Sequence, residues 1–316
     1  RRYMTVLVTG GYGFIGHHLV KCLRNKGYRT IVYDKETYAC EYVDKENVPT
    51  VWSVYGDILD VKKLESVFRI HKFDKVFHLA AESHVDNSIA NPNVFANTNV
   101  IGTVNILNLA KQYGKQVIHV STDEVYGALR SDDKNWNEKQ PVLPNSPYSA
   151  SKASSDLIAL SYHKTYGMDV RVTRCCNNFG TGQHAEKLIP KSILSSIRDK
   201  EILLYGDGTN KREWIHAEDH SEALILVAEK GKAGEIYNIG SGDEYSNNQI
   251  ANKIIKHTQP DTTIRYISDR LGHDFRYAVN YSKIERLGYS PKRSIKNSKE
   301  WNEIIEFYKK HWKTQT

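Results

Sequence analysis

The sequence predicts an α/β fold, a Rossmann-type doubly wound parallel sheet with a smaller C-terminal α/β domain. Short β-branched runs alternate with amphipathic stretches from residue 3 to residue 173, which is the pattern of βαβ units. After Asn177 this rhythm breaks into polar, glycine-rich segments. A chain of 316 residues can hold two joined domains. We expect the first over 1–176, with a returning segment at about 212–237, and the second over 177–316.

The six strands that we expect in the first domain cover residues 4–9, 30–34, 51–55, 75–80, 117–121 and 170–173. Between the first two, Ile15, Leu19, Cys22 and Leu23 recur at helical spacing, and Gly27 is suited to end that helix. Further helices are expected after residues 60, 91 and 147. Doubly wound sheets bind ligands at the carboxyl ends of their strands, so the residues just beyond each strand are the candidates for chemistry.

The last stretch of the chain carries a stripe of large apolar side chains on one helical face. These are Trp301, Ile304, Ile305, Tyr308 and Trp312. Such a stripe suits a membrane or partner surface, but burial against the body of the protein is the more common arrangement. We therefore expect this helix to be buried against the body of the protein.

Composition excludes several classes of protein. Hydrophobic residues make up 40% of the chain and charged residues 26%, which is typical of a folded domain. No apolar window is long enough to cross a bilayer and no signal sequence is visible, so we expect a cytoplasmic protein that binds no membrane. The net charge is +7, but Lys and Arg are spread along the chain. An anionic small substrate explains this charge as well as a nucleic acid, which we do not expect.

The cysteines and histidines give no sign of a metal site. None of the four cysteines forms a Cys-x-x-Cys pair, which argues against zinc and disulfides. His216 and His220 lie close together in sequence with acidic neighbours, but no third-ligand pattern accompanies them. We expect Asp219 to be a helix N-cap with Glu222 completing a capping box.

A glycine-rich loop stands between the first strand and the first helix. Gly10, Gly13 and Gly16 would allow a tight turn, close approach to a pyrophosphate and close packing of helix on strand. A glycine triplet alone is weak support, but Asp34 ends the second strand, where a carboxylate can accept hydrogen bonds from ribose hydroxyls. It would repel a 2′-phosphate, which favours NAD over NADP. Lys35 would soften that repulsion.

The ends of the third and fourth strands also carry candidates. Asp57 and Ile58 follow the third strand, where an adenine would lie, and Ala80, Ala81 and Ser83 follow the fourth, beside a nicotinamide. For Asp57 alone, a turn or helix-capping role is equally good.

Tyr148 and Lys152 are one helical turn apart and project to the same face. A lysine ammonium near a phenol lowers the phenol pKa, so Tyr148 could take a proton from a sugar hydroxyl as hydride leaves for NAD⁺. Upstream, Thr122, Asp123 and Glu124 place a hydroxyl and two acids on consecutive residues. That set suits an enzyme that both transfers hydride and removes water, although a solvated acidic turn is the commoner role of two adjacent acids.

These motifs resemble those of the extended short-chain dehydrogenase/reductase family, and Thr122-Asp123-Glu124 makes the chain most similar to its nucleotide-sugar 4,6-dehydratases. The resemblance runs from about Met4 to about Pro291. It includes the stretches 78–86, 177–180, 186–190, 205–208 and 269–274. Two positions depart from the family, because Ala185 and Leu271 stand where proline is common. Both lie near residues expected to touch the nucleotide, so we expect these two departures to bear on base selectivity.

The resemblance implies an activity and a cofactor. The expected enzyme is a lyase, a dTDP-glucose or UDP-glucose 4,6-dehydratase with NAD tightly bound and regenerated in each cycle. Tyr148 would take the C4 hydroxyl proton while NAD accepts the C4 hydride, Glu124 would remove the C5 proton, Asp123 would protonate the leaving C6 hydroxyl, and hydride would return to C6. The product would be water and an NDP-4-keto-6-deoxy-glucose, on the way to deoxysugars such as rhamnose. A homodimer joined through helices that flank the sheet, including the one that bears Tyr148, is also implied.

The resemblance also implies the residues of each site. Catalysis would rest on Thr122, Asp123, Glu124, Tyr148 and Lys152. The cofactor would contact Gly10, Gly13, Phe14, Ile15, Gly16, Asp34, Lys35, Thr37, Asp57, Ile58, Leu79, Ala80, Ala81, Ser83, Thr98, Tyr148, Lys152 and Asn178. The substrate would contact Ser83, Thr122, Asn177, Lys187, Leu188, Tyr205, Arg212, Asn247, Arg270 and His273. Arg212 and Arg270 suit the diphosphate, although a surface ion pair is the usual role of an arginine.

Two other functions compete with this one. An NDP-sugar 4-epimerase or a 6-deoxysugar reductase on the same scaffold would share Tyr148 and Lys152 but would not need Asp123 and Glu124 together. A non-catalytic NAD-binding or RNA-associated protein would bind nucleic acid in a salt-sensitive way, without sugar turnover. The sequence leaves the choice between dTDP and UDP open.

Overall fold

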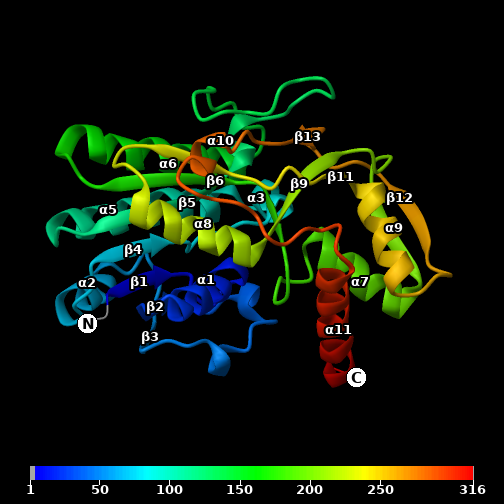
Figure 1. The fold of residues 1–316 in the computed structure, drawn as a ribbon, viewed down its shortest axis with the longest axis horizontal. Coiled ribbons are helices and arrows are strands. Elements are labelled where there is room, and N and C mark those ends of the chain that lie inside the picture. Colours follow the sequence, from blue (N-terminus) through cyan, green and yellow to red (C-terminus); the bar gives the residue numbers. More distant parts are fainter. Residues whose placement is uncertain (1–3, 316) are drawn as a thin grey trace.

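The computed structural model describes residues 4–315, and side chains as far as residue 311. A central sheet of seven parallel strands runs in the order β10-β6-β5-β4-β1-β2-β3 (Figure 1). Its strands are β1 Thr5–Thr9, β2 Arg29–Asp34, β3 Trp52–Tyr55, β4 Lys75–His78, β5 Gln116–Thr122, β6 Val170–Cys175 and β10 Ile236–Ile239. The order reverses between β1 and β4, which creates the crevice where doubly wound sheets bind ligands.

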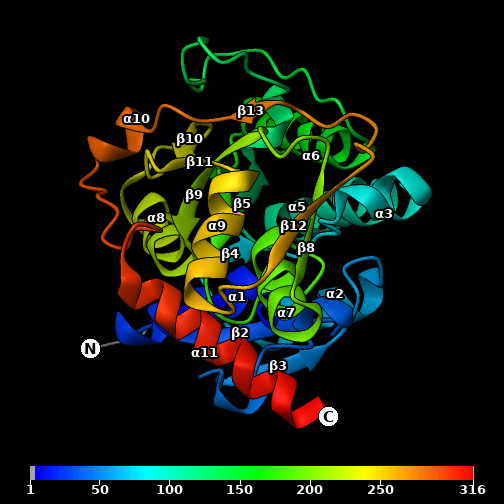
Figure 2. The same ribbon diagram turned by 90° about the vertical axis from the view of Figure 1, so that its right-hand side faces the viewer.

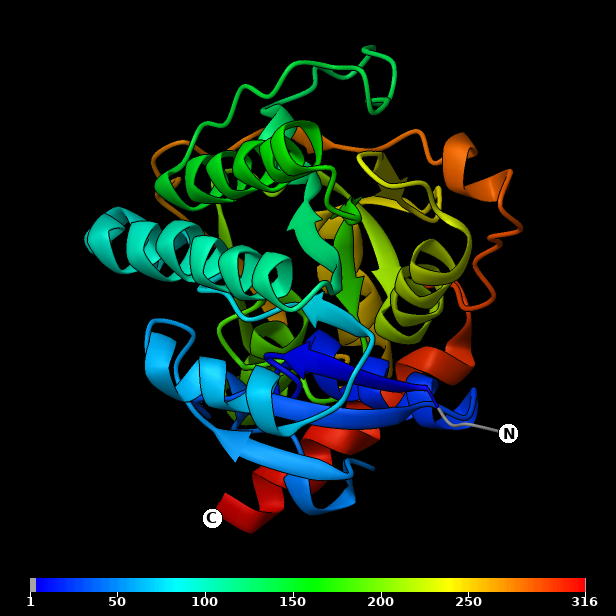
Figure 3. The ribbon, with the colours of Figure 1, turned by 90° about the vertical axis from the view of Figure 1, so that its left-hand side faces the viewer.

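Helices cover both faces of this sheet, as Figure 3 shows. On one face, α1 (Phe14–Asn25) packs against α8 (Ala217–Lys230), and on the other lie α2 (Val61–Ile70), α5 (Gly102–Gln112) and α6 (Pro147–Tyr166). Two buried clusters of aliphatic and aromatic side chains fill the spaces between the sheet and these layers. The doubly wound α/β fold predicted from the sequence is therefore confirmed.

The strand predictions hold to within two residues at each end. The two-residue difference at the end of β4 arises because the chain leaves the sheet after His78 and residues 79–81 turn along the crevice. Gly27 has a left-handed backbone (φ 85°) just past α1, as expected of a residue that ends a helix.

The start of α8 corrects one sequence prediction. His216, not Asp219, is the N-cap, since its ring accepts a hydrogen bond from the Glu218 amide at 3.2 Å. Asp219 lies in the first turn, where its carboxylate accepts bonds from the amide and guanidinium of Arg293, each at 2.7 Å. The predicted capping box with Glu222 is wrong because Asp219 is used to hold the C-terminal segment.

The second region is built around β9, which pairs with β7, β11 and β13, and around the pair β8 and β12. Its strands are β7 Asn177–Phe179, β8 Glu201–Tyr205, β9 Lys211–His216, β11 Glu244–Ser246, β12 Thr263–Ile267 and β13 Arg276–Tyr277. Its helices are α7 Leu188–Asp199, α9 Asn247–His257 and α11 Ser298–Gln315. Figure 2 shows α11 crossing below α9 and α7.

Helix α11 is buried on the face that the sequence predicted. Trp301, Ile304, Ile305 and Tyr308 are all at most 2% exposed and join one cluster with side chains of α7 and α9. The side chain of Trp312 lies outside the described residues. Within residues 4–315, none of the helices combines the length and apolar character that a membrane span requires.

Short elements complete the chain. These are α3 Val85–Ala90, α4 Pro92–Phe95, α10 Ser282–Glu285, the π-helical segment η3 Ala96–Ile101, and the 3₁₀ turns η1 Tyr38–Cys40, η2 Lys45–Asn47 and η4 Asp123–Tyr126. Between η4 and α6 the segment 127–146 crosses to the second region, where Leu129 bridges Arg276 and Trp136 bridges Val279. The two regions are therefore tied together next to the residues predicted to be catalytic.

Candidate active site

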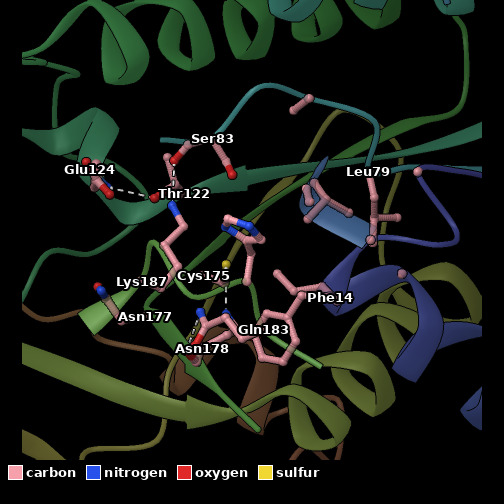
Figure 4. Close-up of a pocket in the computed structure, with 18 of the residues that line it drawn as sticks. Phe14, Leu79, Ser83, Thr122, Glu124, Cys175, Asn177, Asn178, Gln183 and Lys187 are labelled. Carbon is pink, nitrogen blue, oxygen red and sulfur yellow. Dashed lines mark hydrogen bonds between the residues drawn. The ribbon is translucent and has the colours of Figure 1, made fainter. Parts of the chain in front are cut away.

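Three adjoining cavities lie along the carboxyl edge of the central sheet. The central cavity is lined by the glycine loop, the end of β5 and the start of α6. The β2 cavity lies beside the ends of β2 and β3 and shares Gly10 and Leu79 with it. The distal cavity lies against the second region and shares Glu124 and Lys187 with the central one. Together they form one long cleft, part of which appears in Figure 4.

The glycine loop begins the cleft and needs two of its glycines for steric reasons. Gly10 has φ of 72°, and a Cβ there would lie 2.8 Å from the Ala80 amide nitrogen. A Cβ on Gly16 would lie 2.0 Å from the Gly10 carbonyl oxygen. The start of α1 can therefore approach the end of β1, and its free amides and positive dipole end face the central cavity.

Asp34 is fixed at the end of β2, in the β2 cavity. Its carboxylate accepts hydrogen bonds from the amides of Tyr12 at 2.9 Å and Glu36 at 2.7 Å, while burial raises its pKa. Lys35 forms an ion pair with Asp57 at 3.1 Å, so its charge is already matched. This arrangement suits two ribose hydroxyls and disfavours a 2′-phosphate. The glycine loop and Asp34 together fit a dinucleotide that spans the central and β2 cavities.

Tyr148 and Lys152 enter the central cavity from the first turns of α6. A capping box between Ser146 and Ser149 begins this helix. The Lys152 ammonium donates a hydrogen bond to the Val120 carbonyl at 2.8 Å, and both Lys152 and Tyr148 are buried. The phenol and the ammonium therefore lie beside the end of β5, where a substrate would meet the dinucleotide.

The pKa of Tyr148 departs from the sequence argument, which expected Lys152 to lower it. Burial and then the Glu124 carboxylate raise the pKa of Tyr148 well above its usual value, and a hydrogen bond with Thr122 only partly opposes them. Burial also lowers the pKa of Lys152, although the Asp156 carboxylate opposes that shift. Tyr148 can therefore act as a base only where a nearby cation stabilises its phenolate.

The two acids that follow β5 differ in environment. Asp123 is 1% exposed, and burial, then the neighbouring Glu124, raise its pKa well above the usual value. Glu124 lines the cavity; burial raises its pKa too, but Arg270 and Arg212 oppose the shift. Thr122 holds the pair, since its hydroxyl accepts from the Glu124 amide at 3.3 Å. Asp123 is thus the better proton donor and Glu124 the better base.

Cationic side chains gather at the distal cavity. The Lys187 ammonium donates to the Ser83 carbonyl at 2.8 Å, a contact drawn in Figure 4, and Arg270 lies 3.8 Å from Asp86. The Arg270 Nε is buried and, among the described residues, has no hydrogen-bond partner. Unsatisfied guanidinium donors beside a cavity are suited to bind phosphate oxygens.

Arg212 is held differently. Its guanidinium donates to the carbonyls of Lys211 at 2.7 Å and Asp274 at 2.9 Å, and lies over the Tyr277 ring at 4.3 Å. These contacts fix the side chain in the wall of the cavity and neutralise no charge. Its positive charge therefore adds to that of Arg270 within the cleft.

All residues proposed for the cofactor line the central or β2 cavity, and all those proposed for the substrate line the central or distal cavity. Of the five catalytic candidates, only Asp123 is absent from the cavity walls, because its side chain is covered. In Figure 4, Phe14 and Leu79 lie on one side of the central cavity, and Thr122 and Glu124 on the other. The sites themselves stay predictions, since burial and proximity establish no contact with a ligand.

Several lining residues were missed by the sequence argument. They are Ala39, Cys175, Cys176, Gln183, His184, Glu186 and Trp214 in the central cavity, and His84, Val85, Asp86, Lys191, Leu203, Leu204 and Tyr277 in the distal one. Cys175 ends β6, so the rule of strand ends would have found it. Tyr277 and Trp214 have no such signal, because strands of the second region bring them to the cleft.

The chain is similar to known proteins along nearly its full length. The family model described as GDP-mannose 4,6 dehydratase matches residues 7–300. The dTDP-glucose 4,6-dehydratase of Streptomyces antibioticus is 44% identical over 303 residues, 92% of this chain and 89% of that protein. The crystal structure of DesIV, a dTDP-glucose 4,6-dehydratase from Streptomyces venezuelae solved with NAD, has a TM-score of 0.90 at 44% identity, covering 98% of each chain.

A solved epimerase shares the same architecture at lower identity. The UDP-glucose 4-epimerase of Thermus thermophilus, in complex with NAD, has a TM-score of 0.89 at 26% identity, covering 97% of this chain and 99% of that one. The fold is thus common to both activities. On the family match and the identity to its relatives, this chain belongs to the GDP-mannose 4,6 dehydratase family, among proteins of the extended short-chain dehydrogenase/reductase type.

Proposed function

We propose that the protein is an NAD-dependent dTDP-glucose 4,6-dehydratase. The observation that carries this proposal is that Tyr148, Lys152 and Glu124 line one cavity, while Asp123, the neighbour of Glu124, is buried directly behind its wall. Tyr148 with Lys152 suits oxidation of a sugar hydroxyl, and Asp123 with Glu124 suits loss of water. The names of the relatives support dTDP-glucose as the substrate.

The first step is oxidation at C4. Tyr148 takes the proton of the C4 hydroxyl, and Thr122, which hydrogen-bonds Tyr148, orients the C4 oxygen. NAD, which the glycine loop and Asp34 would hold, would supply the acceptor for the C4 hydride and the donor of that hydride to C6. The buried Lys152 ammonium stabilises the phenolate form of Tyr148 that accepts this proton, and so offsets the burial that raises the Tyr148 pKa.

Elimination follows because the C4 ketone makes the C5 proton acidic. Glu124 removes this proton, since nearby cations keep it the more acidic of the pair, and Asp123 protonates the leaving C6 hydroxyl, since burial keeps its proton on. Return of hydride to C6 and of a proton to C5 gives the 4-keto-6-deoxy sugar. The net change is loss of one water without consumption of NAD.

The diphosphate of the substrate fits the cationic wall of the distal cavity. Arg270 has an unpaired, buried Nε there, and Arg212 adds a second fixed guanidinium. We propose that both bind phosphate oxygens and that Lys187 lies between the diphosphate and the sugar. dTDP is favoured over UDP by the relatives' names alone.

A 4-epimerase is the second candidate, favoured by the likeness to the Thermus thermophilus enzyme. It would use Tyr148 and Lys152 in the same way. It gives no reason for a buried acid and a cavity-lining acid on consecutive residues, so we place it second.

Mass spectrometry of the purified protein, incubated with NAD and separately with dTDP-glucose and UDP-glucose, tests the proposal. We expect dTDP-glucose to lose one water without added reductant, and the relative rates to name the nucleotide. If neither sugar loses water, the dehydratase proposal is wrong and the epimerase becomes the better candidate.

Three further expectations accompany the function. Exposed apolar side chains on the sheet-flanking helices, among them Ile101 and Leu157, are consistent with the proposed homodimer. Sedimentation that returns a monomer at working concentration would remove it. A cytoplasmic location and a place on the way to deoxysugars such as rhamnose stay predictions from the sequence.

A further inference from the structure

His184 joins the two sides of the cleft, outside the residues that the proposed chemistry uses. On one side stands the segment after β2, with Tyr38, Glu41 and Tyr42, and on the other the segment after β7, with His184 and Glu186. We call these five residues the His184 bridge. The Tyr38 and His184 rings meet edge to face, 5.1 Å apart, and the Tyr42 ring lies 5.9 Å from His184 on another side.

The bridge also has polar contacts that fix the imidazole. The His184 Nδ1 accepts the Glu186 amide at 3.3 Å, so Nε2 carries a proton and donates it to Glu41 at 3.2 Å. The Tyr38 phenol hydrogen-bonds Glu186 and accepts from the Asn87 amide at 3.4 Å. Each ring nitrogen therefore has a partner on a different side of the cleft.

The C-terminal helix supports the bridge from behind. The Tyr42 ring contacts that of Tyr308 at 5.7 Å, and the Tyr308 hydroxyl donates to the Gln183 carbonyl at 2.5 Å. Tyr308 is fully buried. One rigid side chain of α11 thus holds the segment before His184 and the segment after Tyr38 at the same time.

The His184 bridge lies beside the two cavities in which we propose that the dinucleotide binds. Ala39, the neighbour of Tyr38, lines both the central and the β2 cavity, while His184 and Glu186 line the central one. A dinucleotide that occupies both cavities passes beside Ala39. The contacts between the segments 38–42 and 183–186 therefore lie next to the space that such a dinucleotide would fill.

We propose that the His184 bridge is a latch that retains NAD through successive turnovers. This proposal rests on the proposed function only in requiring that NAD occupies this cleft. The bridge performs no chemical step. It suits a reaction in which the cofactor is regenerated in place, because release between cycles would then serve no purpose.

Exchange of bound NAD tests this latch. Holoenzyme loaded with NAD is mixed with an excess of isotopically labelled NAD, and the rate at which bound nucleotide becomes labelled is followed by mass spectrometry. We expect His184→Ala to exchange about ten-fold faster than the parent, equivalent to about 1.4 kcal/mol. Tyr38→Ala, at a side chain that is 44% exposed, should also exchange faster and is the second variant should His184→Ala fail to fold.

Two matched substitutions sharpen the test. His184→Gln keeps a donor for Glu41 and an acceptor for the Glu186 amide, so it should exchange more slowly than His184→Ala. His71→Ala removes an imidazole that contacts Trp52 at 5.1 Å and lines none of the three cavities, and it should exchange as the parent does.

The exchange experiment gives different results if the latch proposal is wrong and if the cofactor assignment is wrong. If the folded His184→Ala and Tyr38→Ala variants exchange NAD within two-fold of the parent rate, the latch is overturned and the dehydratase stands. If the parent protein binds no NAD at all, the cofactor assignment and the latch fall together.

Discussion

The carboxyl edge of the central sheet and the wall of the distal cavity are built in different ways. The sheet edge is shaped mainly by backbone amides, glycines and side chains at the ends of strands, as at Gly10, Asp34 and Thr122. In the distal cavity, long cationic side chains such as Arg270 come from segments far apart in the chain. The sheet edge can be located from sequence motifs, whereas the wall of the distal cavity is defined only by the tertiary fold.

The electrostatics of the two regions are also opposite. At the sheet edge, burial raises the pKa of Asp123 and Tyr148 and so favours their neutral forms. At the distal wall, guanidinium groups lower the pKa of Glu124 relative to burial alone. Glu124 lies where the two meet, which explains why adjacent acids can have different roles.

Removal of the phenol at the sheet edge should have the largest effect. Tyr148→Phe leaves no base for the C4 hydroxyl, so we expect kcat for formation of the 4-keto product to fall by about a thousand-fold. Tyr162→Phe, on the same helix with its hydroxyl bonded to Asn108, is the control. A Tyr148→Phe variant with parental kcat would exclude this tyrosine as the base.

The acid pair should show a different defect from the phenol. Asp123→Asn and Glu124→Gln leave oxidation possible but slow elimination, by about a hundred-fold for each. Bound NADH should therefore accumulate in a single turnover, which its absorbance reports. Should both variants dehydrate the sugar at the parent rate, the assignment of these acids is wrong.

The distal wall should affect substrate binding alone. Loss of a charge-assisted bond to the diphosphate in Arg270→Ala should raise KM by about ten- to a hundred-fold, with retention of NAD unchanged. Arg265→Ala, at an exposed arginine paired with Glu201, is the matched control. If Arg270→Ala released NAD and left KM as it was, the division between the two regions would not hold.

Some parts of the site could be predicted from the sequence, and others could not. The strands and the glycine loop could be predicted because they depend on local periodicity and on steric limits at Gly10 and Gly16. Tyr38 and His184 could not, since 145 intervening residues must fold before the two rings meet. Leu271, which departs from the family pattern, is 79% exposed, so its side chain faces solvent rather than the cavity wall.

A separate effect is expected on the stability of the protein behind the glycine loop. Four buried histidines lie between α1 and α8, and burial lowers the pKa of His17 to about 2, of His18 to about 4, and of His216 and His220 to about 3. At a pH below 6.5, the ordinary pKa of histidine, these side chains bind protons in the unfolded chain but stay neutral in the folded protein. Stability is therefore full above about pH 6.5 and falls as pH drops towards 4.

Melting temperature measured from pH 7 to pH 4 checks this slope. His18→Gln should reduce the fall of melting temperature with pH. Each histidine that stays neutral only in the folded protein lowers the free energy of unfolding by about 1.4 kcal/mol per pH unit in this range. A parent protein with a constant melting temperature over this range would contradict the account of the buried histidines.

The central claim is that one cleft oxidises C4, removes water and returns the same hydride to C6. The most direct measurement follows dTDP-glucose carrying deuterium at C4, incubated with the holoenzyme and analysed by mass spectrometry and NMR. We predict a product lighter by one water, with the deuterium retained at C6. Retention of the full mass with inversion at C4, or loss of the deuterium from the sugar, would contradict the account.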